Sequence, residues 1–195
     1  IPEGSKNSKG RAIQNLINIE QDDKVKAFIC TRDLKDEDYV NGNYVIMATK
    51  MGQVKKTSLE QYSRPRSNGI NAITVKDGDE LLEAKLTNGN SQIMLAVKSG
   101  KAIRFEENKT RPMGRNASGV RGIRLKDNKD EVVGMISVND MDANILVVSE
   151  NGYGKRSSLE DYRLTNRGGK GVKTISITEK TGKLVTLKSV SDNDD

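Results

Sequence analysis

Runs of apolar residues that end in glycine turns recur along this chain and predict β-strands. In three places an apolar run leads into a turn that ends in glycine, and a second, mixed run follows. The paired runs are residues 44–49 and 53–57, 92–97 and 101–105, and 144–149 and 153–156. The turn glycines, Gly52, Gly100 and Gly152, tolerate the positive φ that tight hairpin turns require. Each pair of runs therefore predicts a β-hairpin.

Each hairpin is followed by the same second half. A basic linker leads to a second glycine, then to alternating apolar and polar residues, and finally to one more apolar strand. The second glycines are Gly69, Gly119 and Gly171; the alternating apolar residues are Ile70, Ile73 and Val75, then Val120, Ile123 and Leu125, then Val172, Ile175 and Ile177; the last strands begin at Leu81, Val132 and Leu184. Residues 1–43 match only the latter half of such a unit, with a strand expected over residues 25–30. The pattern amounts to about three and a half copies of a four-stranded unit.

Repeats of roughly 50 residues with four strands are typical of β-propeller blades, which stack because a single blade cannot bury both faces of its sheet. We therefore expect an all-β, propeller-like single domain over residues 1–195, with about three to four blades present. Its expected parts are a partial blade (1–43) and three blades (44–91, 92–143 and 144–195). Exposed blade edges in a partial propeller make self-association with another copy an expectation.

Little helix is expected. Residues 57–60 and 157–160 fit the capping box, in which a hydroxyl and a carboxylate satisfy free backbone N–H groups. Each predicts a single helical turn between strands, with a polar loop as the alternative. Three acidic clusters, residues 22–23, 36–38 and 77–80, fall at predicted turns. Their spacing matches no calcium loop, so we expect solvated loops there and no metal site.

The composition removes most catalytic chemistry. Among 195 residues there is no histidine and only one cysteine, Cys30. Neither a Ser-His-Asp nor a Cys-His arrangement nor a usual zinc site can therefore form. Cys30 lies in an apolar context and is expected to be a small buried residue. No phosphate-binding loop or signal peptide is visible, and no apolar run approaches the roughly 20 residues of a membrane span. The start at Ile1 and the abrupt end in residues 191–195 suggest a fragment of a longer protein.

Positive charge recurs at the same positions of successive repeats. Lysine and arginine number 33 against 27 aspartates and glutamates, which gives a net charge of +6. The repeated cations are Lys55, Lys56, Lys101, Arg104, Lys155 and Arg156 after the hairpin turn; Arg64, Arg66, Arg111, Arg115, Arg163, Arg167 and Lys170 in the linker; and Arg121 and Arg124 after the second glycine. Blade symmetry would set them in a band around the rim, so they are the candidate DNA-binding residues.

A curved band of spaced cations matches a bent polyanion, because each cation can neutralise one phosphate and release counterions. Few aromatic or amide side chains accompany the cations, so base reading is not indicated. We expect duplex DNA held by its backbone, with a preference set by bendability. The alternatives are ordinary solvated charges at blade edges, where lysine also blocks strand pairing, and a protein-interaction propeller in which the cations are incidental. An enzyme acting on small molecules has the least support.

Four motifs resemble one known family. They are Met47–Lys50, Arg111–Arg115, Gly119–Leu125 and Glu150–Arg156, and the chain is similar to the C-terminal domain of bacterial DNA gyrase A essentially from end to end. The resemblance implies a β-pinwheel, a propeller in which strands are exchanged between blades. It also implies a non-catalytic domain that wraps duplex DNA around a basic perimeter and supports negative supercoiling by a type II topoisomerase.

Partners and a compartment follow from the same resemblance. The implied partners are double-stranded DNA, the remainder of gyrase A, and gyrase B. The implied location is the bacterial cytoplasm, at the nucleoid and away from membranes. The catalytic tyrosine and the ATP and magnesium sites of the parent enzyme would lie outside this chain. No catalytic role is therefore assigned to its five tyrosines, and no cofactor is expected in it.

One motif departs from the family pattern. The family carries a signature box, Gln-Arg-Arg-Gly-Gly-Lys-Gly, in its first blade, whereas residues 165–171 read Thr-Asn-Arg-Gly-Gly-Lys-Gly in a later repeat. We interpret this segment as a repeat-related copy, with the true box upstream of Ile1. The matching domain of topoisomerase IV usually lacks the box, so that domain is an alternative, which the upstream sequence would separate.

Overall fold

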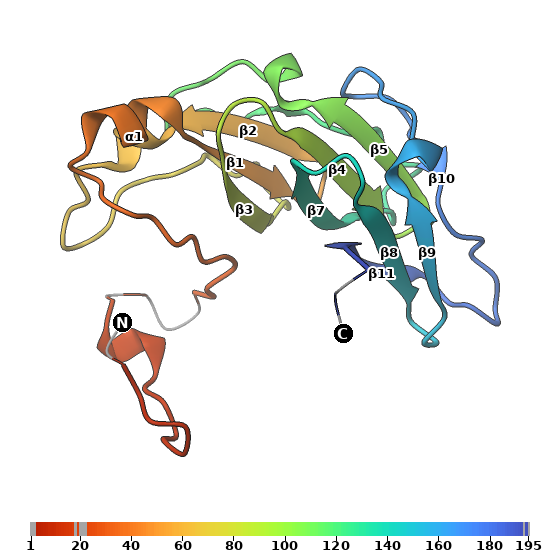
Figure 1. Cartoon of the computed structure of the whole chain (residues 1–195), viewed down its shortest axis with the longest axis horizontal. Helices are drawn as coiled ribbons and strands as arrows, with labels where there is room; N and C mark the ends of the chain where they lie inside the picture. Colours follow the sequence, from red (N-terminus) through yellow and green to blue (C-terminus); the bar gives the residue numbers. More distant parts are fainter. Residues whose placement is uncertain (1–2, 18, 20–22, 193, 195) are drawn as a thin grey trace.

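The computed structural model describes residues 3–17, 19, 23–192 and 194, so the outermost residues of the predicted first and last blades lie outside the described residues. Three antiparallel sheets follow one another along an arch (Figure 1). Their main strands are β1 (Tyr44–Thr49), β2 (Gln53–Ser58) and β3 (Leu81–Thr87); β4 (Gln92–Val97), β5 (Lys101–Glu106) and β7 (Val132–Val138); and β8 (Asn144–Ser149), β9 (Gly154–Ser158) and β11 (Leu184–Val190). Two short strands complete the first two sheets: β6 (Val120–Arg121) belongs to the first sheet and β10 (Val172–Lys173) to the second. The predicted all-β, propeller-like fold is confirmed.

All three predicted hairpins form. β1 pairs with β2, β4 with β5, and β8 with β9, all antiparallel, and Gly52, Gly100 and Gly152 have φ angles of 82°, 82° and 78°. The last strand of each repeat then pairs with the first, which gives the orders β3-β1-β2, β7-β4-β5 and β11-β8-β9. β3, β7 and β11 therefore line the inner side of the arch, and β2, β5 and β9 line its outer side (Figure 1).

The fourth strand of a sheet comes from the following repeat. β6 pairs with β2, and β10 pairs with β5, so the strand exchange that the resemblance implied is present. The prediction of a long alternating strand after each second glycine is wrong. β6 and β10 contain 2 residues each, and residues 70–75 form no strand. The short strands stop because the partner hairpins end there: Gly122 N donates to Gly52 O at 2.8 Å, and Thr174 N donates to Gly100 O at 2.9 Å.

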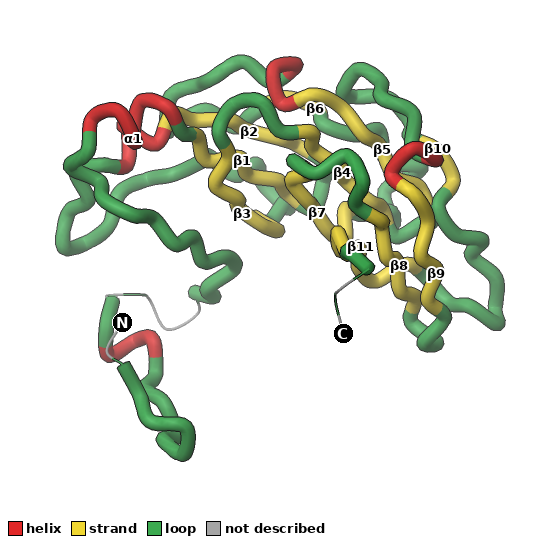
Figure 2. The backbone as a smooth tube through the Cα atoms, in the orientation of Figure 1, coloured by secondary structure: helices red, strands yellow, loops and turns green. Residues whose placement is uncertain are grey.

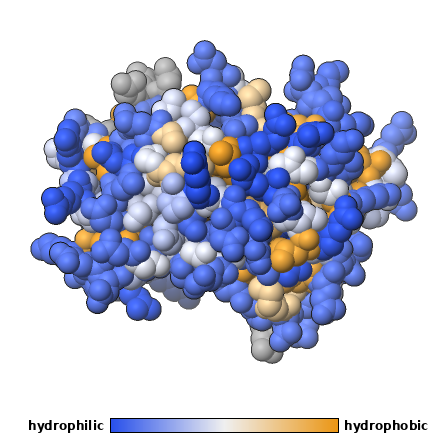
Figure 3. All heavy atoms as spheres, turned by 90° about the horizontal axis from the view of Figure 1, so that it is seen from above, coloured by the Kyte–Doolittle hydropathy of each residue, from blue (hydrophilic) through white to orange (hydrophobic). Residues whose placement is uncertain are grey.

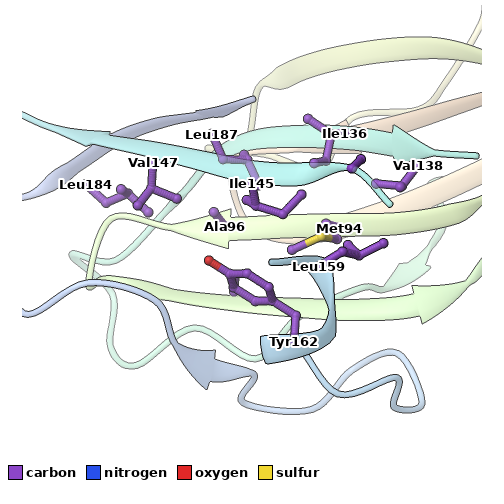
Figure 4. Close-up of a cluster of buried hydrophobic side chains, with 12 residues drawn as sticks. Met94, Ala96, Ile136, Val138, Ile145, Val147, Leu159, Tyr162, Leu184 and Leu187 are labelled. Carbon is purple, nitrogen blue, oxygen red and sulfur yellow. The ribbon is translucent and has the colours of Figure 1, made fainter. Parts of the chain in front are cut away.

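The second sheet lies between the first and the third, so its strand β4 is apolar on both faces. In β4, Ile93 and Leu95 face the first sheet, whereas Met94 and Ala96 face the third. All four are 0% exposed. Figure 4 shows the cluster between the second and third sheets, which β8 and β11 complete. This two-sided burial explains why the first strand of each hairpin reads as a continuous apolar run.

The predicted strand over residues 25–30 and the predicted burial of Cys30 are both wrong. Residues 23–36 contain no strand (Figure 2), and Cys30 is exposed. Ala27 and Ile29 instead pack against the cluster around Val45 and Met47. The alternation of this segment therefore reflects an extended chain lying on a sheet face, with no neighbouring strand to form a ladder.

Residues 36–38 begin a helix and do not form a solvated turn. α1 (Glu37–Gly42) starts after Asp36, whose side chain accepts a hydrogen bond from Tyr39 N at 3.0 Å. Glu37 and Asp38 lie in the first turn, where the partial positive charge of the helix N-terminus favours carboxylates. The acidic cluster is therefore a helix cap. The cluster at residues 77–80 lies in a turn, as expected, and the cluster at residues 22–23 lies partly outside the described residues.

Short 3₁₀ turns follow the outer strand of every hairpin. They are η2 (Leu59–Tyr62), η3 (Glu107–Lys109) and η4 (Leu159–Asp161), and η1 (Ile13–Asn15) lies near the start of the chain. The two predicted helical turns are confirmed, but the reciprocal capping box does not form. Thr57 and Ser157 stay in their strands, and Ser158 caps η4 by accepting from Glu160 N at 3.2 Å. Among the described residues, no helix has the length and apolar character that crossing a membrane requires.

The outer edge of β9 is uncovered. β2 and β5 each pair with a short strand of the next repeat, whereas β9 pairs only with β8 within the part of the chain that the structure describes. Self-association through exposed blade edges stays a prediction, and this edge is one place where it would occur.

Candidate nucleic-acid interface

Three linkers connect the 3₁₀ turns to the segments that follow, and they hold 7 of the 15 predicted DNA-binding residues. We define linker 1 as residues 63–75, linker 2 as residues 110–119 and linker 3 as residues 162–171. None contains aspartate or glutamate, and the acid-free stretches extend over residues 61–76, 108–126 and 162–178. In a chain with 27 acidic residues, the linker cations thus have no acidic residue within their own linkers.

Linkers 2 and 3 run along the outer strands of the preceding sheets. Linker 2 bonds to β2 through Met113 N and Lys56 O at 2.8 Å, and linker 3 bonds to β5 in the same way through Thr165 N and Arg104 O at 2.9 Å. Together with β6 and β10, these bonds fix each linker across the outer edge of another repeat's sheet. Strand exchange therefore places the linkers on the outside of the arch.

The three linkers also contact one another. Thr74 of linker 1 donates through its backbone N and its Oγ1 to Ala117 O and Asn116 O of linker 2, at 3.3 and 2.7 Å. Gly168 N of linker 3 donates to Gly122 O, just beyond linker 2, at 2.6 Å. These backbone contacts join three separate basic segments into one surface. We call the exposed face of the three linkers, with β6 and Arg124, the linker surface.

Seven of the predicted residues are exposed on the linker surface. They are Arg64, Arg66, Arg111, Arg121, Arg124, Arg163 and Lys170. None of the seven forms a salt bridge within the described residues. Seen from the outer side, the molecule is largely hydrophilic, with scattered apolar side chains (Figure 3). Exposed cations without acidic partners attract phosphate groups.

A hollow on this side gathers cations of two repeats. Lys101, Arg124, Lys126 and Lys170 all line a recess of about 190 Å³. Lys101 is half-buried, whereas the other three are exposed. Lys126 was not predicted from the sequence. Its signal is the alternation of the run after the second glycine, in which Lys126 comes two residues after Arg124.

Acidic side chains near this hollow are occupied by backbone groups. Asp127 accepts from Lys129 N at 2.8 Å, and Asp130 accepts from Ser99 N at 2.9 Å. No three histidine, cysteine, aspartate or glutamate side chains are grouped so that they could hold a metal ion, as far as the described residues show. The chemistry that the linker surface offers is charge neutralisation and hydrogen bonding.

The prediction that Lys55 and Lys56 lie on the basic rim is wrong. The two residues are 0% and 4% exposed, because linker 2 and β6 cover β2. Lys56 Nζ pairs with the buried carboxylate of Glu107 at 3.0 Å. Lys55 Nζ donates to the carbonyl oxygens of Ala72 and Arg115, the latter at 2.6 Å. Both ammonium groups therefore belong to the interior.

Arg104 is also placed differently from a rim cation. It occupies the repeat position of Lys56 and, like Lys56, it contacts the next repeat. Its guanidinium donates to Gln92 Oε1 at 2.5 Å and to Leu159 O and Tyr162 O at 2.8 and 3.2 Å. Burial lowers the pKa of Arg104. Its main contacts hold two repeats together.

Arg115 and Arg167 are half-buried at equivalent positions of linkers 2 and 3, and each binds the neighbouring segment. Arg115 Nη1 donates to Asn71 O at 3.2 Å, and Arg167 Nη1 donates to Arg121 O at 3.0 Å. These two arginines tie the linkers to one another, so only part of each guanidinium is available to a phosphate.

Lys155 and Arg156 are exposed because no strand covers β9 in the described residues. They occupy the repeat positions of the buried Lys55 and Lys56. Arg156 pairs with Asp192 at 3.0 Å. The same residue types therefore have opposite environments in two repeats, depending on whether a following linker lies over the outer strand.

Sheets in this order, with strands exchanged between successive repeats and a basic outer surface, define a partial β-propeller of the pinwheel type. A model of the family described as DNA gyrase C-terminal domain, beta-propeller, matches residues 1–32, 43–88, 92–139 and 143–191. The chain belongs to the DNA gyrase C-terminal domain family.

Individual relatives agree with this membership. DNA gyrase A of Staphylococcus epidermidis is 43% identical over 196 residues, and that of Staphylococcus aureus is 44% identical over 197 residues. The matches cover 100% of this chain but 21% and 22% of those proteins, so the chain spans about a fifth of their length. Among solved structures, the C-terminal domain of DNA topoisomerase IV has a TM-score of 0.84 at 26% identity, covering 94% of this chain and 55% of that one. The DNA gyrase A C-terminal domain has a TM-score of 0.81 at 26% identity, covering 96% and 60%.

Proposed function

We propose that this chain is a non-catalytic DNA-binding domain of a type II topoisomerase of the gyrase kind, and that it holds bent duplex DNA by its phosphate backbone on the linker surface. The observation that supports this most is the contact of three acid-free linkers from successive repeats, two of which run along the outer strands of an arch. Cations spaced along a convex curve can follow the phosphates of a bent duplex. Membership of the gyrase C-terminal domain family supports the same function.

In this proposal the chain supports negative supercoiling while the reaction itself takes place elsewhere. The curated relatives are named as DNA gyrase A proteins and are about five times longer than this chain. The chain has no histidine and no phosphate-binding loop. We therefore assign strand cleavage, ATP and magnesium to the remainder of gyrase A and to gyrase B. The corresponding setting is the bacterial cytoplasm, at the nucleoid.

Replacing Arg121 and Arg124 by alanine should weaken binding to unrelated duplexes by similar factors. Each lost phosphate contact reduces the slope of log affinity against log salt by about 0.9, so the slope should fall by about 2 and the affinity roughly tenfold at moderate salt. Fluorescence anisotropy with two unrelated duplexes over a salt series measures both quantities. A large loss for only one DNA sequence would contradict backbone binding.

A control variant removes two lysines from the inner side of the arch. Lys85 of β3 and Lys188 of β11 line one hollow between inner strands, so Lys85→Ala with Lys188→Ala should change the slope little. If both double variants lost the same slope, the overall charge of the protein would be responsible and the linker surface would not. Salt-independent or absent duplex binding by the unmodified chain would favour the protein-interaction propeller.

Wrapping is tested by sealing nicked circular DNA with ligase while the protein is bound. DNA that follows the outer curve should leave the sealed circles with a linking-number change of one consistent sign, growing with the ratio of protein to DNA. The change is read from topoisomer bands after the protein is removed. Binding without any linking-number change would reject wrapping and leave backbone binding in place.

The C-terminal domain of topoisomerase IV is a second candidate, favoured by its TM-score of 0.84 to this chain. It involves the same surface and the same backbone chemistry. The relatives at 43% and 44% identity are both gyrase proteins, which favours the gyrase assignment. A signature box in the sequence upstream of Ile1 would support gyrase further.

A further inference from the structure

Lys55 is a buried lysine directly beneath two basic linkers. It is 0% exposed, and its ammonium donates to Ala72 O of linker 1 and to Arg115 O of linker 2, the latter at 2.6 Å. Burying an ammonium is unfavourable unless hydrogen bonds replace its lost water. Burial, together with the nearby Arg115 guanidinium, lowers the pKa of Lys55 to about 8. The charged group therefore has a structural cost, which its contacts with the two linkers offset.

The other repeats show what this lysine adds. Ile103 occupies the equivalent position of β5, where it joins the apolar cluster between the first two sheets. Lys155 occupies it in β9 and is exposed. Since isoleucine fills the position in a complete sheet, the fold does not require an ammonium there. The ammonium of Lys55 contacts carbonyl groups of two linkers instead.

The two linkers that Lys55 joins carry separate groups of exposed arginines. Arg64 and Arg66 belong to linker 1, and Arg111 belongs to linker 2. The other bonds between these linkers, such as Thr74 Oγ1 to Asn116 O at 2.7 Å, lie at the exposed surface, where water competes for the same groups. Lys55 bonds to both linkers from below, out of contact with water, and therefore limits their movement relative to each other.

We propose that Lys55 is a positioning residue for DNA binding. Its ammonium holds linkers 1 and 2 at a fixed spacing, so that Arg64, Arg66 and Arg111 meet one DNA backbone together. The inference rests on the proposed function, because it concerns the same surface. Lys55 itself cannot touch a phosphate, since the linkers cover it. Any effect on DNA larger than the loss of one charge must therefore act through the other cations.

The variant Lys55→Ile, which copies the residue of the next repeat, tests the proposal. The salt slope of duplex binding should fall by about 2 to 3 and the Kd should rise roughly tenfold, because the arginines of two linkers no longer act together. Lys155→Ile is the matched control. It removes one exposed cation from the same repeat position and can reduce the slope by no more than about 1. A reduction of about 1 or less for Lys55→Ile overturns the positioning role.

Changing the pH gives a second readout that a purely structural role would not affect. With a pKa of about 8, the Lys55 ammonium is charged at pH 7 and mostly neutral at pH 9, whereas a lysine in a model peptide, with a pKa near 10.4, is charged at both. The slope of the unmodified protein should therefore fall at pH 9 toward that of Lys55→Ile, whose own slope should change little. An unmodified protein with equal slopes at the two pH values overturns the role of the charge.

Folding of each variant is checked by circular dichroism and thermal unfolding. If Lys55→Ile does not fold, Lys55→Met replaces it, because an unbranched side chain of similar length keeps the packing and removes only the ammonium. Its slope should fall by the same amount, about 2 to 3, and a fall of about 1 or less overturns the proposal. Failure of the proposed function looks different, since the unmodified protein would then show no salt-dependent duplex binding. If the unmodified protein binds and Lys55→Ile binds with the same slope, only the positioning role fails.

Discussion

Replacing Gly171 by alanine should destabilise the fold by about 3 kcal/mol, one of the two largest effects expected from a single change. Gly171 has a φ of 71°, and a Cβ there would overlap the backbone oxygen of Ala102 in β5. A side chain in the left-handed region costs about 1–2 kcal/mol, and a clash with backbone adds to this because a strand cannot easily move. Urea unfolding followed by circular dichroism measures the change.

Gly78→Ala is the control for this substitution. Gly78 has a similar φ of 76°, but a Cβ there would meet nothing within 4 Å. Only the backbone strain remains, so the expected cost is about 1 kcal/mol. Equal destabilisation by the two alanines would show that the approach of linker 3 to β5 is not as close as described. A larger cost at Gly171 confirms that the second glycine of the repeat serves strand exchange.

Replacing Glu107 by alanine should destabilise the fold by about 3–5 kcal/mol, because it leaves a buried ammonium without its ion-pair partner. The Glu107 carboxylate is 0% exposed, pairs with Lys56 Nζ at 3.0 Å, and accepts from Thr87 Oγ1 at 2.7 Å and Ser91 N at 3.2 Å. After the change, the main remaining neighbour of the Lys56 ammonium is the Tyr44 ring, whose centre is 4.1 Å away. Urea unfolding again gives the free energy.

The double variant Lys56→Met with Glu107→Leu should recover most of this stability. Leu59 and Leu159 occupy the position of Glu107 in the other repeats and are buried, so the site accommodates leucine. Apolar residues of similar volume often replace a buried ion pair without loss. The single variants Lys56→Met and Glu107→Leu complete a double-mutant cycle, which gives the interaction free energy of the pair. A double variant as unstable as Glu107→Ala would show that the unpaired charge is not the cause.

The hairpins and inner strands of this fold could be predicted from sequence because their signals are local. A glycine such as Gly100 needs only its own turn to explain its positive φ, and the apolar runs on either side pair with each other. The same local information located the three basic linkers between the hairpins and the second glycines, where the structure has exposed cations. It could not show that the linkers contact one another, because those contacts join residues of different repeats.

Whether a predicted cation is buried depends on the repeat that follows it, so its burial could not be predicted from the sequence of its own repeat. Lys55 and Lys56 have the same spacing from their turn glycine as Lys155 and Arg156, yet linker 2 covers the first pair and the second pair is exposed. The predicted strand over residues 25–30 was wrong for a related reason. Their alternation is that of a strand, but no neighbouring strand pairs with them.

Strand exchange has a consequence for any experiment on shortened pieces of this protein. A piece that ended before residue 107 would lose Glu107, linker 2 and β6, and the ammonium groups of Lys55 and Lys56 would come to the surface. Such a piece would become more cationic on its outside by losing residues, and it would attract DNA through groups that the longer chain keeps in its interior. Pieces that extend past the second glycine of the next repeat avoid this error.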